Sequence, residues 1–184
     1  MAKYLSVIIP CYNEQENLKR GVLTEVFNYL KSKDFDWEVI ISDDGSSDSS
    51  REIVKAEIRK FKNFKLLENP HGGKPSALYY GIKKAQGDWV LFTDMDQSTP
   101  IDQVEKFFPK LNEGYDIVIG SRVGRKGAPW VRKLMSIGFG LLRLLVLRLP
   151  YRDTQTGFKA FKREAGKTIF GKMKVFFDRM HVVG

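Results

Sequence analysis

The sequence predicts an α/β fold: a Rossmann-like, mostly parallel sheet with helices on both faces. Short apolar, β-branched runs alternate with longer segments of helical periodicity, which is the pattern of successive βαβ units. Polar residues directly follow several of the apolar runs, as they do where parallel strands end at a ligand-binding edge. A length of 184 residues suits one domain with a sizeable core.

Five apolar runs are expected to form strands, because β-branched and aromatic residues favour extended backbone. They are Tyr4–Ile9, Trp37–Ser42, Phe64–Leu67, Trp89–Thr93 and Asp116–Ile119. Segments with apolar residues at helical spacing lie between these runs. The expected helices are Glu14–Lys31, Asp48–Phe61, Ser76–Ala85 and Pro100–Leu111.

Charge is distributed unevenly along the chain. Residues 1–121 have a net charge of −3, whereas residues 122–184 contain 15 Lys and Arg against three acidic residues and reach +12. A basic half beside a mildly acidic half indicates a polyanion, an anionic membrane or a phosphorylated substrate as the partner. No linker separates the two parts, so both are predicted to belong to the same domain.

Cysteine usage excludes a disulfide scaffold, because Cys11 is the only cysteine in the sequence. A reducing compartment is therefore favoured. Cys11 follows an apolar run, so a small buried hydrophobe is favoured over a reactive thiol. The N-terminal segment lacks a small-residue cleavage site and is not typical of a signal peptide.

Three polar clusters follow the ends of predicted strands. They are PCYNE at Pro10–Glu14, DDGSSD at Asp43–Asp48 and DMD at Asp94–Asp96. We expect them to converge on one crevice, because the carboxyl ends of parallel strands meet at the same edge. Side chains two apart in an extended segment point the same way, so Asp94 and Asp96 can face one ligand while Met95 turns away. Because Mg²⁺ takes carboxylate oxygens and is completed by substrate phosphates, DMD is predicted to hold a metal–diphosphate, with a helix cap or solvated loop as the alternative.

The other two motifs have both local and functional interpretations. In DDGSSD, Ser47 or Asp48 is expected to cap the following helix, which leaves Asp44 to accept hydrogen bonds from a base or a ribose. HGGKPSA begins at His71 and leads into a helix, so its amides and Lys74 are candidates for anion binding. His71 itself is interpreted as a turn residue, and no neighbouring histidine supports a zinc site.

Taken together, the motifs resemble those of family 2 glycosyltransferases, which have the GT-A fold. VIIPCYNE, DDGSSD, Gly73–Lys74, GDWVLFTDMDQSTP, GSR and DTQTGFKAF occur in the order seen in that family. The set is most similar to polyprenyl-phosphate sugar synthases of the dolichyl-phosphate glucosyltransferase type, and the resemblance covers about Tyr4 to Phe170. The resemblance implies an inverting hexosyltransferase that takes a nucleotide sugar of the UDP-glucose or GDP-mannose class and a lipid phosphate acceptor.

The resemblance also implies roles for individual residues. The nucleotide would be bound by Pro10, Tyr12, Glu14, Asp44, Lys74 and Asp94. Asp94 and Asp96 would hold Mg²⁺ or Mn²⁺ and act in catalysis together with Arg122 and Asp153. The acceptor phosphate would meet Arg122, Arg132, Gln155 and Lys159. On this view residues 1–121 are the nucleotide-sugar-binding half, and residues 122–184 are the basic segment that faces acceptor and membrane.

Three departures from the family pattern keep alternatives open. Pro75 replaces the small residue that usually follows the lysine, and Gln97 replaces an apolar residue. Near the C-terminus the family's Phe-Asp-x-Glu stretch is matched only at Phe177–Asp178, with Met180 in place of the acid. A truncated, catalytically impaired homologue that only binds nucleotide is therefore one alternative, and a basic nucleic-acid-binding module is another, although no nucleic acid is expected.

The segment Lys133–Tyr151 is not a transmembrane span, because Arg143 and Arg148 interrupt its apolar runs. Leucines with interspersed arginines suit a helix lying in the membrane interface, with a core helix as the alternative. The sequence therefore predicts a cytoplasmic protein bound peripherally to the cytoplasmic face of an anionic membrane. It does not indicate an oligomeric state.

Overall fold

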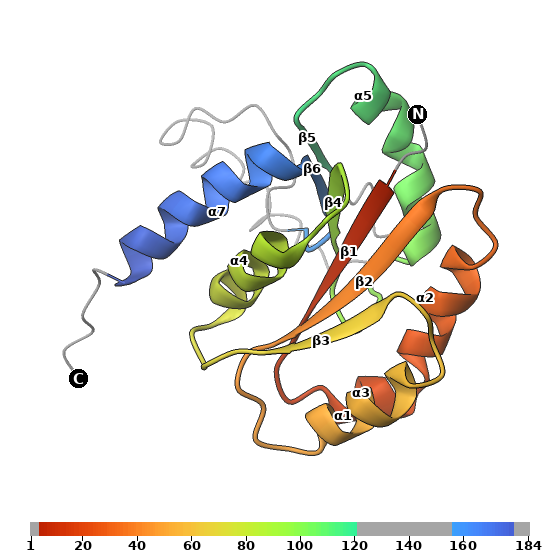
Figure 1. Ribbon diagram of the computed structural model, residues 1–184, viewed down its shortest axis with the longest axis vertical. Coiled ribbons are helices and arrows are strands. Elements are labelled where there is room, and N and C mark those ends of the chain that lie inside the picture. The colour runs from red at the N-terminus through yellow and green to blue at the C-terminus, as the bar shows by residue number, and fades with distance from the viewer. Residues whose placement is uncertain (1–3, 121–155, 179–184) are drawn as a thin grey trace, which may run out of the picture. The chain divides into compact units, whose positions relative to one another are not determined.

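The computed structural model describes residues 4–120 and 156–178, which form a six-stranded sheet with helices on both faces (Figure 1). The strands are β1 (Tyr4–Cys11), β2 (Asp36–Asp43), β3 (Phe64–Glu68), β4 (Trp89–Phe92), β5 (Ile117–Ile119) and β6 (Lys159–Lys162). Their order is β3-β2-β1-β4-β6-β5. β1 runs parallel to β2 and β4, β2 runs parallel to β3, and β6 runs antiparallel to β4. The predicted α/β fold with a mostly parallel sheet is confirmed.

The helices largely follow the predicted segments, with two corrections. They are α1 (Gln15–Lys19), α2 (Val22–Leu30), α3 (Ser50–Ile58), α4 (Lys74–Lys84), the 3₁₀ helix η1 (Ile101–Lys106), α5 (Phe108–Asn112) and α7 (Arg163–Asp178). A single helix over residues 14–31 was wrong, because Gly21 adopts a left-handed conformation with φ 85° and separates α1 from α2. A single helix over residues 100–111 was also wrong, since Pro109 has no N–H for a regular α-helical bond.

The sequence prediction missed β6 and α7. β6 has four residues, too few for a clear alternation of apolar and polar side chains. It forms because β4 offers it a partner: Leu91 lies opposite Ala160 and Phe92 lies opposite Lys159. This pairing is non-local, so no local pattern in the sequence indicates it.

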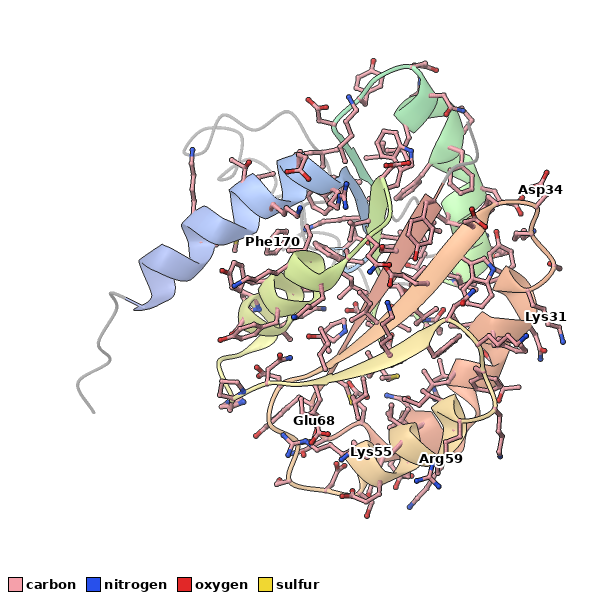
Figure 2. All side chains as sticks on the ribbon, viewed as in Figure 1. Lys31, Asp34, Lys55, Arg59, Glu68 and Phe170 are labelled. Carbon is pink, nitrogen blue, oxygen red and sulfur yellow. The ribbon has the colours of Figure 1, made fainter. Side chains whose placement is uncertain are left out.

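Alternate residues of the strands pack into two apolar layers. On one face, Val7 and Ile9 of β1 join side chains of α1, α2, α3, η1 and α5. On the other face, Ile8 of β1 joins Ile82 of α4 and Phe170 of α7, and these two helices pack against each other. Figure 2 shows Phe170 pointing from α7 toward the sheet. The period of two along β1 therefore explains why helices cover both faces.

Two units can be distinguished along the chain, one made of residues 1–118 and 157–184 and the other of residues 119–156. All helices described above belong to the first unit, as does the sheet apart from the end of β5. Within the part of the chain that the structure describes, no helix combines the length and the apolar character needed to span a membrane.

Candidate functional site

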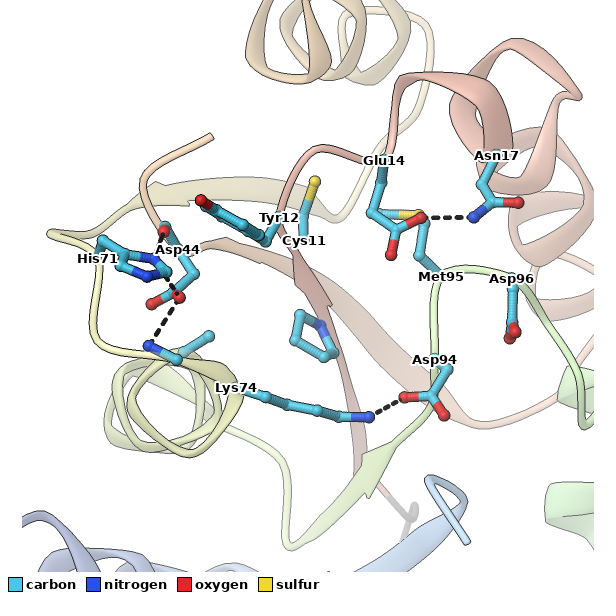
Figure 3. Close-up of a pocket in the computed structure, with 13 residues that line it drawn as sticks. Cys11, Tyr12, Glu14, Asn17, Asp44, His71, Lys74, Asp94, Met95 and Asp96 are labelled. Carbon is cyan, nitrogen blue, oxygen red and sulfur yellow. Dashed lines mark hydrogen bonds and ion pairs between the residues drawn. The ribbon is translucent and has the colours of Figure 1, made fainter. Parts of the chain in front are cut away.

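A cavity of about 380 Å³ lies at the carboxyl ends of β1, β2 and β4, beside the start of α4 (Figure 3). Its volume falls in the range of small-molecule sites. The lining residues are Pro10, Cys11, Tyr12, Glu14, Asn17, Asp44, His71, Gly73, Lys74, Ala77, Asp94, Met95 and Asp96. The three polar clusters that follow the strand ends thus meet in one cavity, and all six predicted nucleotide-binding residues line it.

Asp44 is buried at the end of the cavity near the glycine loop. Its Oδ1 accepts the N–H of Gly72 at 3.0 Å, and its Oδ2 accepts the N–H of Gly73 at 2.8 Å. The ring Nδ1 of His71 lies 3.0 Å from the same Oδ2. Asp44 therefore fixes the loop before α4, and the two glycine amides that the sequence offered for an external anion are engaged by this carboxylate.

An aromatic pair lies beside Asp44. The rings of Tyr12 and His71 are 4.7 Å apart between centroids and are inclined by 30°. Tyr12 is 47 % exposed, so solvent reaches this residue. An exposed ring at the rim of a cavity can stack on a planar group such as a nucleobase. His71 was interpreted only as a turn residue, and its role in this pair depends on tertiary contacts that no sequence signal indicates.

The neighbouring Asp43 has a structural role. Its carboxylate accepts the N–H groups of Gly45 and Ser46 and forms an ion pair with Arg51 at 2.6 Å. Ser47 or Asp48 was expected to cap this helix. The N-cap position of α3 is Ser49, whose side chain forms no capping bond, and it is Asp48 whose Oδ1 accepts the N–H of Ser50, the first residue of α3, at 3.0 Å. The adjacent residues Asp43 and Asp44 thus hold different loops. Asp43 holds the loop before α3, and Asp44 holds the loop before α4.

Asp94 and Lys74 meet across the cavity. The Nζ of Lys74, the first residue of α4, donates to Oδ1 of Asp94, which lies two residues beyond the end of β4 (Figure 3). The side chains are 51 % and 31 % exposed, so water and ligands reach both. An exposed ion pair contributes little to stability and can be exchanged for contacts with a ligand.

Asp96 lies in the same cavity. Met95 between the two aspartates is buried in the core but also lines the cavity, so the expectation that it turns away was wrong. Oδ1 of Asp96 accepts the N–H of Ser98 at 2.8 Å, which leaves Oδ2 without a hydrogen bond from this turn. Among the residues described, no three His, Cys, Asp or Glu side chains form a group that could hold a metal ion. Two carboxylates fit Mg²⁺ or Mn²⁺ only when phosphate oxygens complete the coordination.

Two further cavity residues, Cys11 and Glu14, are constrained by their surroundings. Cys11 is buried, and burial together with the negative charge of Asp43 raises the pKa of its thiol to about 12. A neutral thiol is a poor nucleophile. The buried position agrees with the expectation that Cys11 is a small buried hydrophobe and not a reactive thiol. Glu14 accepts a hydrogen bond of 2.5 Å from Asn17 Nδ2, which orients its carboxylate at the cavity wall. Asn17 was not among the predicted site residues.

The predicted acceptor residues are only partly covered by the structure. Lys159 begins β6 opposite Phe92, at the same edge of the sheet as the cavity, although it does not line the cavity. The other predicted acceptor and catalytic positions lie outside the described residues: Arg122, Arg132, Asp153 and Gln155. The expected interfacial helix within residues 130–151 also lies outside them.

Comparison with known proteins decides the family. The model of Glycosyl transferase family 2 matches residues 6–170, which is most of the chain. The chain belongs to glycosyl transferase family 2. Its sheet and helices are the GT-A fold of such enzymes, and the predicted resemblance is confirmed.

Family 2 relatives include several dolichyl-phosphate beta-glucosyltransferases. The chain is 39 % identical over 180 residues to dolichyl-phosphate beta-glucosyltransferase ALG5A of Trichomonas vaginalis, covering 91 % of this chain and 55 % of that protein. It is 32 % identical over 194 residues to the dolichyl-phosphate beta-glucosyltransferase of Homo sapiens, covering 94 % and 59 %. The chain thus spans a little over half the length of these curated relatives.

Solved structures of other proteins show the same architecture. The chain matches glucosyl-3-phosphoglycerate synthase of Mycobacterium tuberculosis, in complex with Mn²⁺, UDP-glucose and glycerol 3-phosphate, with a TM-score of 0.64. The two chains are 23 % identical, and the match covers 96 % of this chain and 66 % of that one. At this level of identity the likeness supports the fold alone.

Proposed function

We propose that this chain carries the donor site of a metal-dependent hexosyltransferase that moves glucose from a nucleotide diphosphate to dolichyl phosphate or another polyprenyl phosphate. The observation that carries the proposal is that one cavity is lined by an exposed ring, a buried carboxylate and the Lys74–Asp94 pair. The curated relatives support glucose and a dolichyl phosphate by their names. A donor of the GDP-mannose class is the alternative to UDP-glucose.

The parts of the donor are proposed to lie along different walls of the cavity. Tyr12 is proposed to stack on the base, and Asp44 is proposed to accept hydrogen bonds from the base or ribose beside the glycine amides. Pro10 and Glu14 complete this end. The diphosphate then lies toward Lys74, whose ammonium group exchanges its bond to Asp94 for one to a phosphate oxygen.

Charge stabilisation is the chemistry that the site must supply. A Mg²⁺ or Mn²⁺ ion held by Asp94 and Asp96 would neutralise charge on the departing diphosphate. The acceptor phosphate is already anionic, so its oxygen attacks the anomeric carbon without a strong general base, and one displacement inverts the configuration. Arg122, Arg132, Asp153, Gln155 and Lys159 are proposed to orient the acceptor.

The basic part of the chain is proposed to bind the membrane surface that holds the lipid acceptor. Residues 122–184 carry a net charge of +12, and each Lys or Arg near an anionic leaflet contributes about 1 kcal/mol of attraction. Peripheral binding at the cytoplasmic face is part of this proposal. Replacing Arg132, Lys133, Arg143 and Arg148 together with Gln should release the protein from anionic liposomes in a sedimentation assay. Undiminished sedimentation of this variant would show that the segment does not bind the membrane.

The donor site is tested by titration calorimetry with UDP-glucose and with GDP-mannose, each with and without Mn²⁺. We expect one nucleotide sugar to bind, and Mn²⁺ to strengthen its binding. Transfer of radiolabelled glucose from UDP-glucose to dolichyl phosphate in anionic liposomes then tests the reaction. If neither donor binds at millimolar concentration, the cavity is not a nucleotide-sugar site.

A further inference from the structure

Gly157 lies directly against the carboxylate of Asp94. A Cβ atom at residue 157 would be 1.9 Å from Oδ2 of Asp94 and 2.4 Å from its Cγ, far inside van der Waals contact. Gly157 is not among the described glycines with positive φ, so its backbone does not itself require glycine. The requirement comes from space, and the group that occupies this space is a predicted metal ligand.

The antiparallel ladder explains why these two residues meet. Phe92, the last residue of β4, lies opposite Lys159, the first residue of β6. Asp94 lies two residues after Phe92, and Gly157 lies two residues before Lys159. Because the strands are antiparallel, the same register places Asp94 opposite Gly157. Cross-strand neighbours approach closely enough for their side chains to compete for space.

Lys74 contacts the same carboxylate. Its ammonium group donates to Oδ1 of Asp94, while the missing side chain of Gly157 leaves room for Oδ2. We propose that Gly157 is a positioning residue whose lack of a side chain sets the orientation in which Asp94 presents its oxygens to the metal–diphosphate. This inference rests on the proposed donor site, because it assigns Asp94 to that ligand.

Other glycines in the same part of the chain have different neighbours. A Cβ at Gly166 would lie 2.1 Å from Cδ1 of Ile82, a core side chain, whereas a Cβ at Gly171 would meet no atom within 4 Å. A methyl group at Gly157 displaces the end of a partly exposed side chain rather than the core. Gly157→Ala should therefore leave the protein folded and turn the Asp94 carboxylate away from the cavity.

A double-mutant cycle tests this role. Four proteins are compared: the parent, Gly157→Ala, Asp94→Ala, and the double variant, with Gly171→Ala as the matched control for a glycine-to-alanine change. Calorimetry measures Mn²⁺-dependent binding of UDP-glucose and GDP-mannose, and the midpoint of thermal unfolding without ligand measures stability. Gly157→Ala should weaken Mn²⁺-dependent binding by about 10- to 100-fold, the range seen when groups that orient a metal ligand are changed. Gly171→Ala should bind as the parent does.

The decisive comparison uses the Asp94→Ala background. There the carboxylate is gone, so adding Gly157→Ala should weaken binding no further and should restore any thermal stability that the single Gly157→Ala change removes. Equal losses of binding in both backgrounds would overturn the inference, because Gly157 would then act independently of Asp94. If the parent itself binds neither donor, the proposed function fails, while the stability rescue still decides whether the two residues compete for space.

Discussion

Two carboxylates near opposite edges of the sheet, Glu38 and Asp94, are held in opposite ways. Near the amino ends of the strands, Glu38 of β2 is only 2 % exposed. Its oxygens accept hydrogen bonds from Ser6 Oγ at 2.7 Å, from the N–H of Gln86 at 2.7 Å and from Lys65 Nζ at 2.9 Å. Both oxygens of this buried carboxylate have partners within the protein, so the network has little capacity for a ligand.

At the carboxyl edge, Asp94 and Lys74 form an ion pair that solvent reaches. Asp96 nearby uses only Oδ1 to accept the N–H of Ser98 in its turn. This pair lines a cavity, whereas Glu38 does not. The number of charges therefore does not separate a structural network from a ligand-accessible one. Burial and complete hydrogen bonding do, because a fully paired buried group cannot exchange partners without a large penalty.

The largest effect should come from Asp96→Asn, which removes one charge at nearly constant shape. Stabilisation of a departing diphosphate by a metal contributes several kcal/mol, so we expect transfer to fall about 100-fold or more. Mn²⁺-dependent binding of the nucleotide sugar should weaken sharply in calorimetry, while the midpoint of thermal unfolding stays close to that of the parent. Unchanged affinity would show that Asp96 is not a metal ligand.

Replacing Glu38, near the amino ends of the strands, should have the opposite effect: a loss of stability without a loss of binding. Glu38→Ala leaves the hydroxyl of Ser6 and the N–H of Gln86 without their acceptor, so we expect the free energy of unfolding to fall by about 2 kcal/mol. Urea denaturation measures this change, and calorimetry should show an unchanged affinity for the nucleotide sugar. A large loss of affinity in a folded Glu38→Ala protein would contradict the separation of the two edges.

A smaller effect on binding is expected from Lys74→Met, which keeps the length of the side chain and removes its charge. The lost bond to a phosphate oxygen should weaken donor binding about tenfold. Stability should change by less than about 1 kcal/mol, because exposed ion pairs contribute little. Lys110→Met is a matched control, since Lys110 forms a similar exposed pair with Glu113 outside the cavity. Equal affinities of the two variants would show that Lys74 does not contact the donor.

The smallest effect concerns acid stability. Burial alone would raise the pKa of Glu38, but hydrogen bonds from Lys65, Ser6 and Gln86 outweigh it and lower the pKa below the ordinary value of 4.5. A lowered pKa in the folded state stabilises the protein above the unfolded value, and this contribution is lost as the pH falls through the folded value. Below about pH 4.5 the parent should therefore lose stability more steeply than Glu38→Gln. Parallel curves of unfolding free energy against pH would contradict this assignment.

Much of the fold and of the site could be predicted from local sequence. All five expected strands are present, because apolar runs of β-branched residues specify extended, buried segments wherever they pair. The clusters after β1, β2 and β4 line one cavity, since parallel strands bring their carboxyl ends to the same edge. Local pattern was sufficient here because each feature depends on neighbours in the chain or on a general rule of sheet topology.

Tertiary structure decided what depends on contacts between distant residues. Which of two adjacent aspartates supports α3 and which supports the loop before α4 follows from Arg51 on one side and Gly73 on the other. Nothing within DTQTGFKAF shows that Gly157 lies against Asp94, because only the antiparallel pairing of β6 with β4 brings these residues together. The sequence by itself thus determined which side chains gather at the edge of the sheet. Their orientations were determined by strand register and close packing, which couple residues far apart in the chain.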